Sequence, residues 1–206
     1  MVAFMGECCI ACDAFAERRE METHTVHWRR VDLPGHEVCR LQELPDGWQL
    51  SGETAFAYER KACRLDYAIT CDGQWQTLSA KVAGWVGDRR VDVEVEREPS
   101  GLWRLDGQEC SAVAGCVDVD LNFSPSTNLL PIRRLDLVVG QMARVRAAWL
   151  RFPSFALEPL EQSYTRLEPD RYRYESAGGQ FVAHLGVDDA GLVTDYGRLW
   201  VREDLG

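Results

Sequence analysis

Turn-forming residues recur along the chain and divide it into short runs that favour β-strands. Each run is bounded by a pair or triplet of the type that closes a β-hairpin. The turn residues are Asp46 with Gly47, Asp72 with Gly73, Asp106 with Gly107, Gly178 with Gly179, and Asp189 with Ala190 and Gly191. Tryptophans follow glycine-containing turns at Trp48, Trp75 and Trp103, and we interpret them as packing on neighbouring hairpins. No helical period follows residue 23, so the chain is predicted to be a series of hairpins.

Alternation of apolar and polar residues shows how these strands face a core. In the run 89–97, Val91, Val93 and Val95 share one face and acidic residues occupy the other. The run 143–152 becomes apolar on both faces, as expected for a strand that is covered on both sides or bulged. So many antiparallel strands must curl or close to hide their edges. We predict an all-β fold with a single domain over residues 24–206, in which a large, strongly curved antiparallel sheet forms a half-barrel or open β-barrel.

The amino-terminal residues 1–23 show no β pattern and are predicted to be an extension that is poorly ordered or forms a short helix. Glu7 and Asp13 interrupt any signal-peptide core, and no basic segment precedes them, so a cytoplasmic location is expected. Thiols should stay reduced there, and Cys63 and Cys71 fall on the apolar face of a strand. The net charge of -10 disfavours nucleic acid as a partner. Charges interrupt every apolar run before it reaches the length of a transmembrane segment.

The segment 115–135 concentrates two carboxylates and two guanidiniums around a loop that contains two prolines. Period-2 alternation predicts that Asp118 and Asp120 point from one face of a strand. A second strand after the loop would carry Arg133 onto an apolar face, where a buried cation needs an acceptor. The two acids could each pair with Arg133 or Arg134, or they could serve as a catalytic acid and base. Three residues on other predicted strands could join either arrangement: Glu37, Arg151 and Tyr164.

The same segment resembles the signature of a bacterial family called putative glycolipid-binding proteins. The resemblance rests on residues 115–121, 125–128 and 130–135, with supporting pieces at 33–37, 47–52, 148–153, 162–164 and 195–200. It extends from about residue 28 to residue 202, and Ser124 and Leu129 stand where the family pattern has threonines. The resemblance implies a curved β-sheet of half-barrel to barrel shape, similar to periplasmic lipoprotein carriers, and a glycolipid or another amphipathic small molecule as the partner.

Motifs for metals and cofactors do not emerge from the sequence. Asp118, Asp120 and Asn122 begin like a calcium loop, but Phe123 replaces the required glycine and Leu129 replaces the bidentate acid. The four histidines, His24, His27, His36 and His184, lack the close spacing of zinc ligands along the chain. Phosphate loops, dinucleotide fingerprints and serine-nucleophile motifs are absent from the sequence, so neither a metal nor a cofactor is expected.

Three functional hypotheses follow from these observations. The first is a protein that binds a lipid-like molecule in an apolar barrel interior, with a polar cluster orienting the head of the ligand. That cluster comprises Asp118, Asp120, Asn128, Arg133 and Arg134, with Glu37, Arg151 and Tyr164 as further candidates. The second is an enzyme of unknown reaction that uses the paired carboxylates in the pocket. The third is a structural or interaction protein in which the cluster only stabilises the fold.

Overall fold

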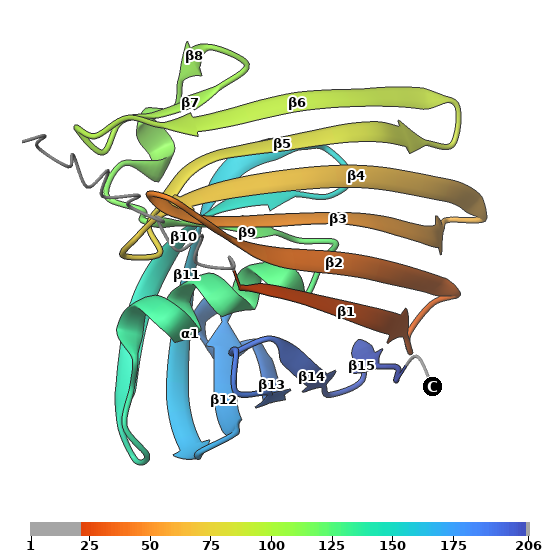
Figure 1. The fold of residues 1–206 in the computed structure, drawn as a ribbon. Coiled ribbons are helices and arrows are strands. Elements are labelled where there is room, and N and C mark those ends of the chain that lie inside the picture. The colour runs from red at the N-terminus through yellow and green to blue at the C-terminus, as the bar shows by residue number, and fades with distance from the viewer. Residues whose placement is uncertain (1–21, 205–206) are drawn as a thin grey trace, which may run out of the picture.

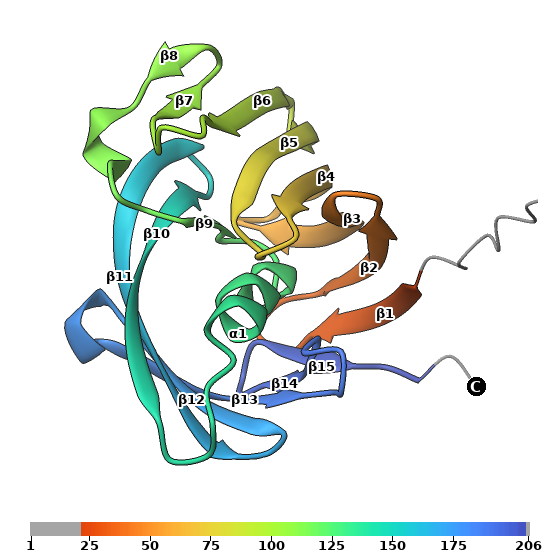
Figure 2. The same cartoon turned by 60° about the vertical axis from the view of Figure 1, so that its left-hand side comes forward.

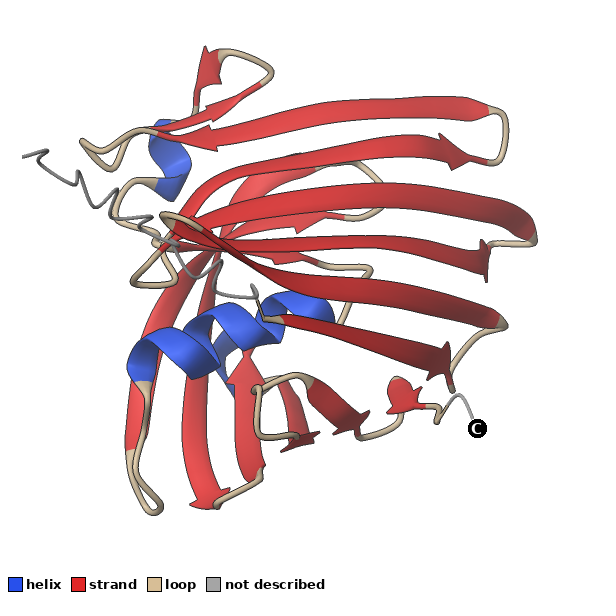
Figure 3. Ribbon diagram, in the orientation of Figure 1, coloured by secondary structure: helices blue, strands red, loops and turns tan. Residues whose placement is uncertain are grey.

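The computed structural model describes residues 22–204, and a single sheet of 15 strands runs through them. Figures 1 and 3 show that strands dominate and that the sheet is strongly curved. The predicted all-β fold with a curved, open barrel-like sheet is therefore confirmed. The predicted amino-terminal extension, together with Cys8, Cys9 and Cys12, lies outside the described residues.

The strands of the first half follow the predicted hairpins. They are β1 (Thr23–Arg30), β2 (Gly35–Leu44), β3 (Gly47–Tyr58), β4 (Lys61–Asp72), β5 (Thr77–Val86), β6 (Arg89–Arg97), β7 (Trp103–Leu105) and β8 (Gln108–Glu109). Each strand from β1 to β7 pairs antiparallel with the next strand in sequence, and β8 is an edge of the sheet. The predicted turns that contain Asp46, Gly73 and Gly107 lie between consecutive strands of this meander, and Gly47 is the first residue of β3.

The second half is a shorter meander preceded by a helical segment. Its strands are β9 (Asp118–Leu121), β10 (Met142–Arg151), β11 (Ala156–Glu168), β12 (Arg171–Ser176), β13 (Phe181–Val187), β14 (Val193–Tyr196) and β15 (Trp200–Arg202). The helix α1 (Leu129–Leu135) lies between β9 and β10, and single turns of 3-10 helix occur at Ser111–Val113, Ser126–Asn128 and Ala177–Gly179. No helix in residues 22–204 is long and apolar enough to cross a membrane.

The two meanders join where β1 pairs antiparallel with β15, with Trp28 opposite Arg202. The sheet therefore runs from β8 at one edge through this junction to β9 at the other edge. The sheet is mostly antiparallel, as predicted, and the exception lies at that second edge, where β9 pairs parallel with β10. A parallel neighbour requires a crossover connection, and the segment that contains α1 supplies it.

The helix α1 also corrects the prediction of a strand after residue 128. Its first four residues, Leu129 to Ile132, are all buried, and Pro131 is tolerated because it stands in the first turn. The helix ends at Asp136, whose backbone is left-handed with φ 41° and whose N–H donates to the Ile132 carbonyl. The period-2 pattern of residues 133, 135 and 137 suggested a strand, whereas burial of the whole first turn favours the helix.

The segment from β9 through α1 fills the concave side of the sheet, and Figure 2 shows α1 enclosed by the curve of the strands. Leu121, Leu129 and Leu130 are fully buried within the core. Between β5 and the residue before β9, the Thr77 N–H donates to the Val117 carbonyl at 3.3 Å. The Thr77 hydroxyl in turn accepts the Val119 N–H at 3.0 Å. These bonds attach β9 to β5, so the barrel interior holds its own chain segment. Cys63 and Cys71 are buried, as predicted from their parity.

Candidate functional site

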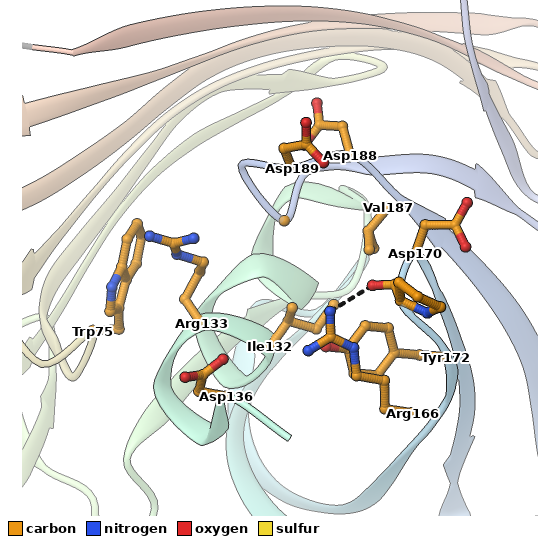
Figure 4. Close-up of a pocket in the computed structure, with 12 residues that line it drawn as sticks. Trp75, Ile132, Arg133, Asp136, Arg166, Asp170, Tyr172, Val187, Asp188 and Asp189 are labelled. Atoms are coloured by element: carbon orange, nitrogen blue, oxygen red, sulfur yellow. Dashed lines mark hydrogen bonds between the residues drawn. The ribbon is translucent and has the colours of Figure 1, made fainter. Parts of the chain in front are cut away.

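A pocket of about 370 Å³ opens at the end of the barrel where α1 terminates. Figure 4 shows that its walls come from four places: the turn that carries Trp75, the end of α1, strands β11 and β12, and the loop that follows β13. Two further hollows, of about 130 and 570 Å³, adjoin it and share Trp75 and Arg133 as lining residues. Trp75 and Arg133 therefore stand at the junction of three depressions, and we call this region the mouth.

The Arg133 guanidinium lies over the Trp75 ring, with Cζ 5.1 Å from the ring centre. Trp75 in turn stacks on Trp48, with ring centres 4.7 Å apart and planes inclined by 16°. Within residues 22–204, no carboxylate forms an ion pair with Arg133. The prediction that Arg133 lies on an apolar strand face was thus wrong, because the helix turns this side chain outward into the mouth. Of the two arginines considered as partners of the acids, Arg134 is the one that binds Asp118.

The opposite wall of the pocket is held rigidly by Arg166. Its guanidinium donates to the Leu137 carbonyl at 2.7 Å and to the Pro169 carbonyl at 2.5 Å. It also lies over the Tyr172 ring, 5.6 Å from its centre. The carboxylates of Asp136, Asp170 and Asp189 complete a rim that mixes charges of both signs (Figure 4). The pocket thus offers carboxylate acceptors and the Arg133 guanidinium, which has no ion-pair partner among residues 22–204, to a polar ligand.

Four exposed apolar side chains lie close in the chain to Asp136 and Arg166, which line the pocket. Val138, Val139 and Met142 are each more than half exposed, and Leu167 is 39% exposed. Backbone hydrogen bonds link Gly140 to Arg166 at 2.7 Å and Arg166 to Gln141 at 2.9 Å, so this loop lies against a wall of the pocket. We call Val138, Val139, Met142 and Leu167 the apolar rim.

The carboxylate of Asp118, on β9, is bound by Arg134, which lies in the last turn of α1. Nε of Arg134 donates to Oδ1 at 2.9 Å, and Nη2 donates to Oδ2 at 2.5 Å. The Asp118 side chain is 2% exposed and that of Arg134 is 21% exposed. Because both carboxylate oxygens accept bonds from one guanidinium, this pair fixes α1 to β9. Arg134 also lines the hollow of about 570 Å³ beside the pocket.

Asp120 does not meet an arginine as predicted, because the amide of Gln162 donates to its Oδ2 at 2.6 Å. Burial raises the pKa of Asp120 to about 6. Beside it, the Tyr164 hydroxyl donates to Oδ1 of Asn128 at 3.0 Å. These contacts attach β9 and the turn before α1 to β11. The two acids therefore have separate partners, and this arrangement does not support a shared catalytic pair.

Glu37 belongs to a third polar contact between the sheet and the internal segment. Its Oε1 accepts hydrogen bonds from the Tyr67 hydroxyl at 2.7 Å and from the Ser124 hydroxyl at 2.5 Å. Burial raises the pKa of Glu37 to about 8, so the carboxyl is protonated at neutral pH. Its other oxygen, Oε2, is buried without a hydrogen-bond partner in the described part of the chain.

Arg151 is remote from these contacts. It forms an exposed ion pair with Glu158 at 3.4 Å and lies over the Trp149 ring. The predicted cluster is thus divided: Arg133 faces the mouth, Arg151 faces solvent, and the others anchor the internal segment. The anchoring residues are Glu37, Asp118, Asp120, Asn128, Arg134 and Tyr164. The mouth residues Trp75, Arg166, Tyr172 and Asp189 were not predicted, although the tryptophan after the turn at Gly73 was a visible signal.

The fold and mouth define a class of protein: an open β-barrel whose interior is filled by its own helical segment and whose pocket lies at one end. The chain belongs to the family described as putative glycolipid-binding, whose model matches residues 25–202. It is similar to the crystal structure of a DUF1089 family protein from Pseudomonas aeruginosa, with 34% identity and a TM-score of 0.74, over 82% of this chain and 92% of that chain.

A second solved structure is a β-barrel-like protein of the DUF1849 family from Brucella abortus. It shares 10% identity with this chain at a TM-score of 0.48, over 88% of this chain and 94% of that one. None of the curated proteins matches the chain.

Proposed function

We propose that the protein binds an amphipathic small molecule of the glycolipid class, with the polar head in the mouth and the apolar chain along the apolar rim. The observation that carries this proposal is the Arg133 guanidinium, which lies over Trp75 at the junction of three hollows and has no ion-pair partner within residues 22–204. The family description supports the same class of ligand.

The groups around the mouth suit a sugar that carries an anionic substituent. Trp75 is buried and stacks on the half-buried Trp48, so the aromatic surface left for the apolar face of a sugar ring is that of Trp48. Asp136 and Asp189 can accept hydrogen bonds from hydroxyl groups. The Arg133 guanidinium can donate to a carboxylate or phosphate in bidentate geometry.

The size of the pocket limits which part of a ligand enters it. A volume of about 370 Å³ is at the small end of the range for small-molecule sites, enough for a sugar head and too small for a whole lipid. Leu129, Leu130 and Ile132 of α1 occupy the concave side of the sheet. We therefore place the chain of the ligand on the exposed apolar rim, in contrast to the hypothesis of an apolar ligand cavity inside the barrel.

Two alkyl glycosides with the same chain test this proposal: n-octyl β-D-glucuronide and n-octyl β-D-glucoside, both below their critical micelle concentrations. Binding is measured by calorimetry and by tryptophan fluorescence. We expect the glucuronide to bind roughly fivefold more tightly, since an exposed ion pair contributes about 1 kcal/mol. Arg133→Met should abolish that difference, and Trp75→Leu should weaken both ligands.

Arg90→Met is the matched control, because Arg90 is an exposed arginine on β6 and does not line the mouth. It should leave both affinities unchanged. Equal affinities for the two glycosides in the unmodified protein would contradict the role of Arg133. Failure of Trp75→Leu to weaken either ligand would contradict the location of the site.

A further inference from the structure

Two histidines and a glutamate converge on the outer face of the junction between β1 and β15. His27 lies in β1, His36 lies in β2, and Glu203 directly follows β15. One potential ligand atom from each of them lies within 4.8 Å of the others. The three residues are distant in sequence, and only the pairing of the strands brings them together.

Backbone hydrogen bonding places all three side chains on the same outer face. The Glu203 N–H donates to the His27 carbonyl at 2.8 Å, on one side of β1. On the other side of β1, His36 is the register partner of Arg29. Val26 and Trp28 point into the core, so His27, between them, points outward. The cluster is thus built on paired strands, which hold side chains more precisely than loops do.

The nitrogen and oxygen atoms of the cluster make few hydrogen bonds to one another. His27 has a buried Nδ1 without a hydrogen-bond partner among residues 22–204. Nδ1 of His36 lies 3.7 Å from Oε2 of Glu203, which is an ion-pair distance and too long for a hydrogen bond. The two imidazole centres are 6.4 Å apart. A buried ring nitrogen without a partner is costly, and coordination of a metal ion by Nδ1 of His27 would relieve that cost.

The other oxygen of Glu203 has a fixed partner. Nε of Arg29 donates to Oε1 at 2.8 Å, which orients the carboxylate and leaves Oε2 directed at His36. Metal-binding carboxylates are commonly oriented in this way by an outer hydrogen bond. Two neutral imidazoles with one carboxylate form a ligand set that suits zinc and related transition metals and is too poor in oxygen for calcium.

We propose that His27, His36 and Glu203 form a binding site for a divalent transition metal such as zinc, with the remaining coordination positions open to water. Tetrahedral zinc with bonds of about 2.1 Å places two ligand atoms about 3.4 Å apart, so atoms that now lie within 4.8 Å need to close by at most about 1.4 Å. His36 is exposed and can make that adjustment by rotation of its side chain. This site lies on the outer face of the sheet and does not depend on ligand binding at the mouth.

Cobalt(II) and zinc titrations of the full chain test the proposal. Cobalt bound by nitrogen and oxygen shows visible d–d absorption without a near-ultraviolet thiolate band, whereas cobalt bound by the cysteines shows that band. We expect one equivalent of cobalt to bind without the thiolate band and to be displaced by zinc. His36→Ala and Glu203→Gln should each weaken binding at least about tenfold.

His184→Ala is the matched control, since His184 is an exposed histidine on β13 outside the cluster. It should leave the affinity unchanged. As an independent readout, zinc should shift the NMR signals of the His27 and His36 rings and leave those of His24 and His184 in place. Binding that is unchanged in His36→Ala, a spectrum with only thiolate-bound cobalt, or ring signals that do not move would each overturn the proposal.

Discussion

The Arg134 guanidinium holds both carboxylate oxygens of Asp118, which lies 16 residues earlier in the chain. Asp118 is on β9 and Arg134 is in the last turn of α1, so this pair determines how the helix sits inside the barrel. The neighbouring Arg133 points instead into the mouth. Two consecutive arginines therefore have different roles, one in the fold and one in the candidate site.

Replacement of Arg134 should test the structural role. Arg134→Met leaves the Asp118 carboxylate buried without its partner, so we expect a loss of about 3 kcal/mol in the free energy of unfolding. Asp118→Asn in the Arg134→Met background should recover part of that loss. Urea unfolding of the four proteins in the double-mutant cycle measures the coupling. A coupling near zero would contradict the role of this pair.

Replacement of Arg133 should have little effect on stability and a clear effect on ligand preference. The side chain is exposed and contacts the Trp75 ring, so Arg133→Met should change the free energy of unfolding by less than about 1 kcal/mol. The preference for the glucuronide over the glucoside should disappear in the same protein. Urea unfolding and calorimetry on one preparation measure both effects, and a strongly destabilised Arg133→Met protein would argue against a free cation at the mouth.

Glu37 should make stability depend on pH. Burial raises its pKa from 4.5 to about 8, so between these values the folded protein keeps a proton that the unfolded chain releases. Stability is then highest below pH 4.5 with respect to this group and falls as the pH rises to 8, by at most about 1.4 kcal/mol per pH unit. Asp120, whose pKa rises from 3.8 to about 6, adds a decline of the same sign at lower pH.

Glu37→Gln isolates that contribution because the amide oxygen can still accept the bonds from Tyr67 and Ser124. We expect its unfolding free energy to change less than that of the unmodified protein between pH 6 and pH 8, as measured by urea unfolding at several pH values. Parallel pH profiles for the two proteins would show that Glu37 is not protonated in the folded state.

Replacement of Tyr164 tests the contact between β11 and the turn before α1, and it should not affect ligand binding at the mouth. Tyr164→Phe removes the hydroxyl that donates to Asn128 and leaves a buried acceptor, which should cost about 1–2 kcal/mol of unfolding free energy. Glycoside affinity should be unchanged, because the hydroxyl does not line the pocket. Reduced affinity at unchanged stability would place Tyr164 in the ligand site.

The sequence predicted the strands well because period-2 alternation and hairpin turns are local signals. It did not predict α1, since a seven-residue helix with Pro131 in its first turn shows too little periodicity to outweigh the alternation of Arg133 and Leu135. Because a strand was predicted in place of the helix, Arg133 was expected in the core. Its contact with Trp75, which is 58 positions earlier in the chain, was therefore not predicted. His27, His36 and Glu203 were also missed, because strand pairing across the β1–β15 junction has no local sequence signature.

The β1–β15 junction also determines an order of folding. Within each meander, strands pair with their neighbours in sequence, so those contacts close short loops and can form early. The junction instead joins residues such as Arg29 and Glu203, which are 174 positions apart, and the chain-entropy cost of closing that loop is larger. We therefore expect the two meanders to form first and to dock late. Transient opening of the β1–β15 pairing would leave the strand pairing within each half in place, while the bonds of β9 to β5 would still connect the two halves.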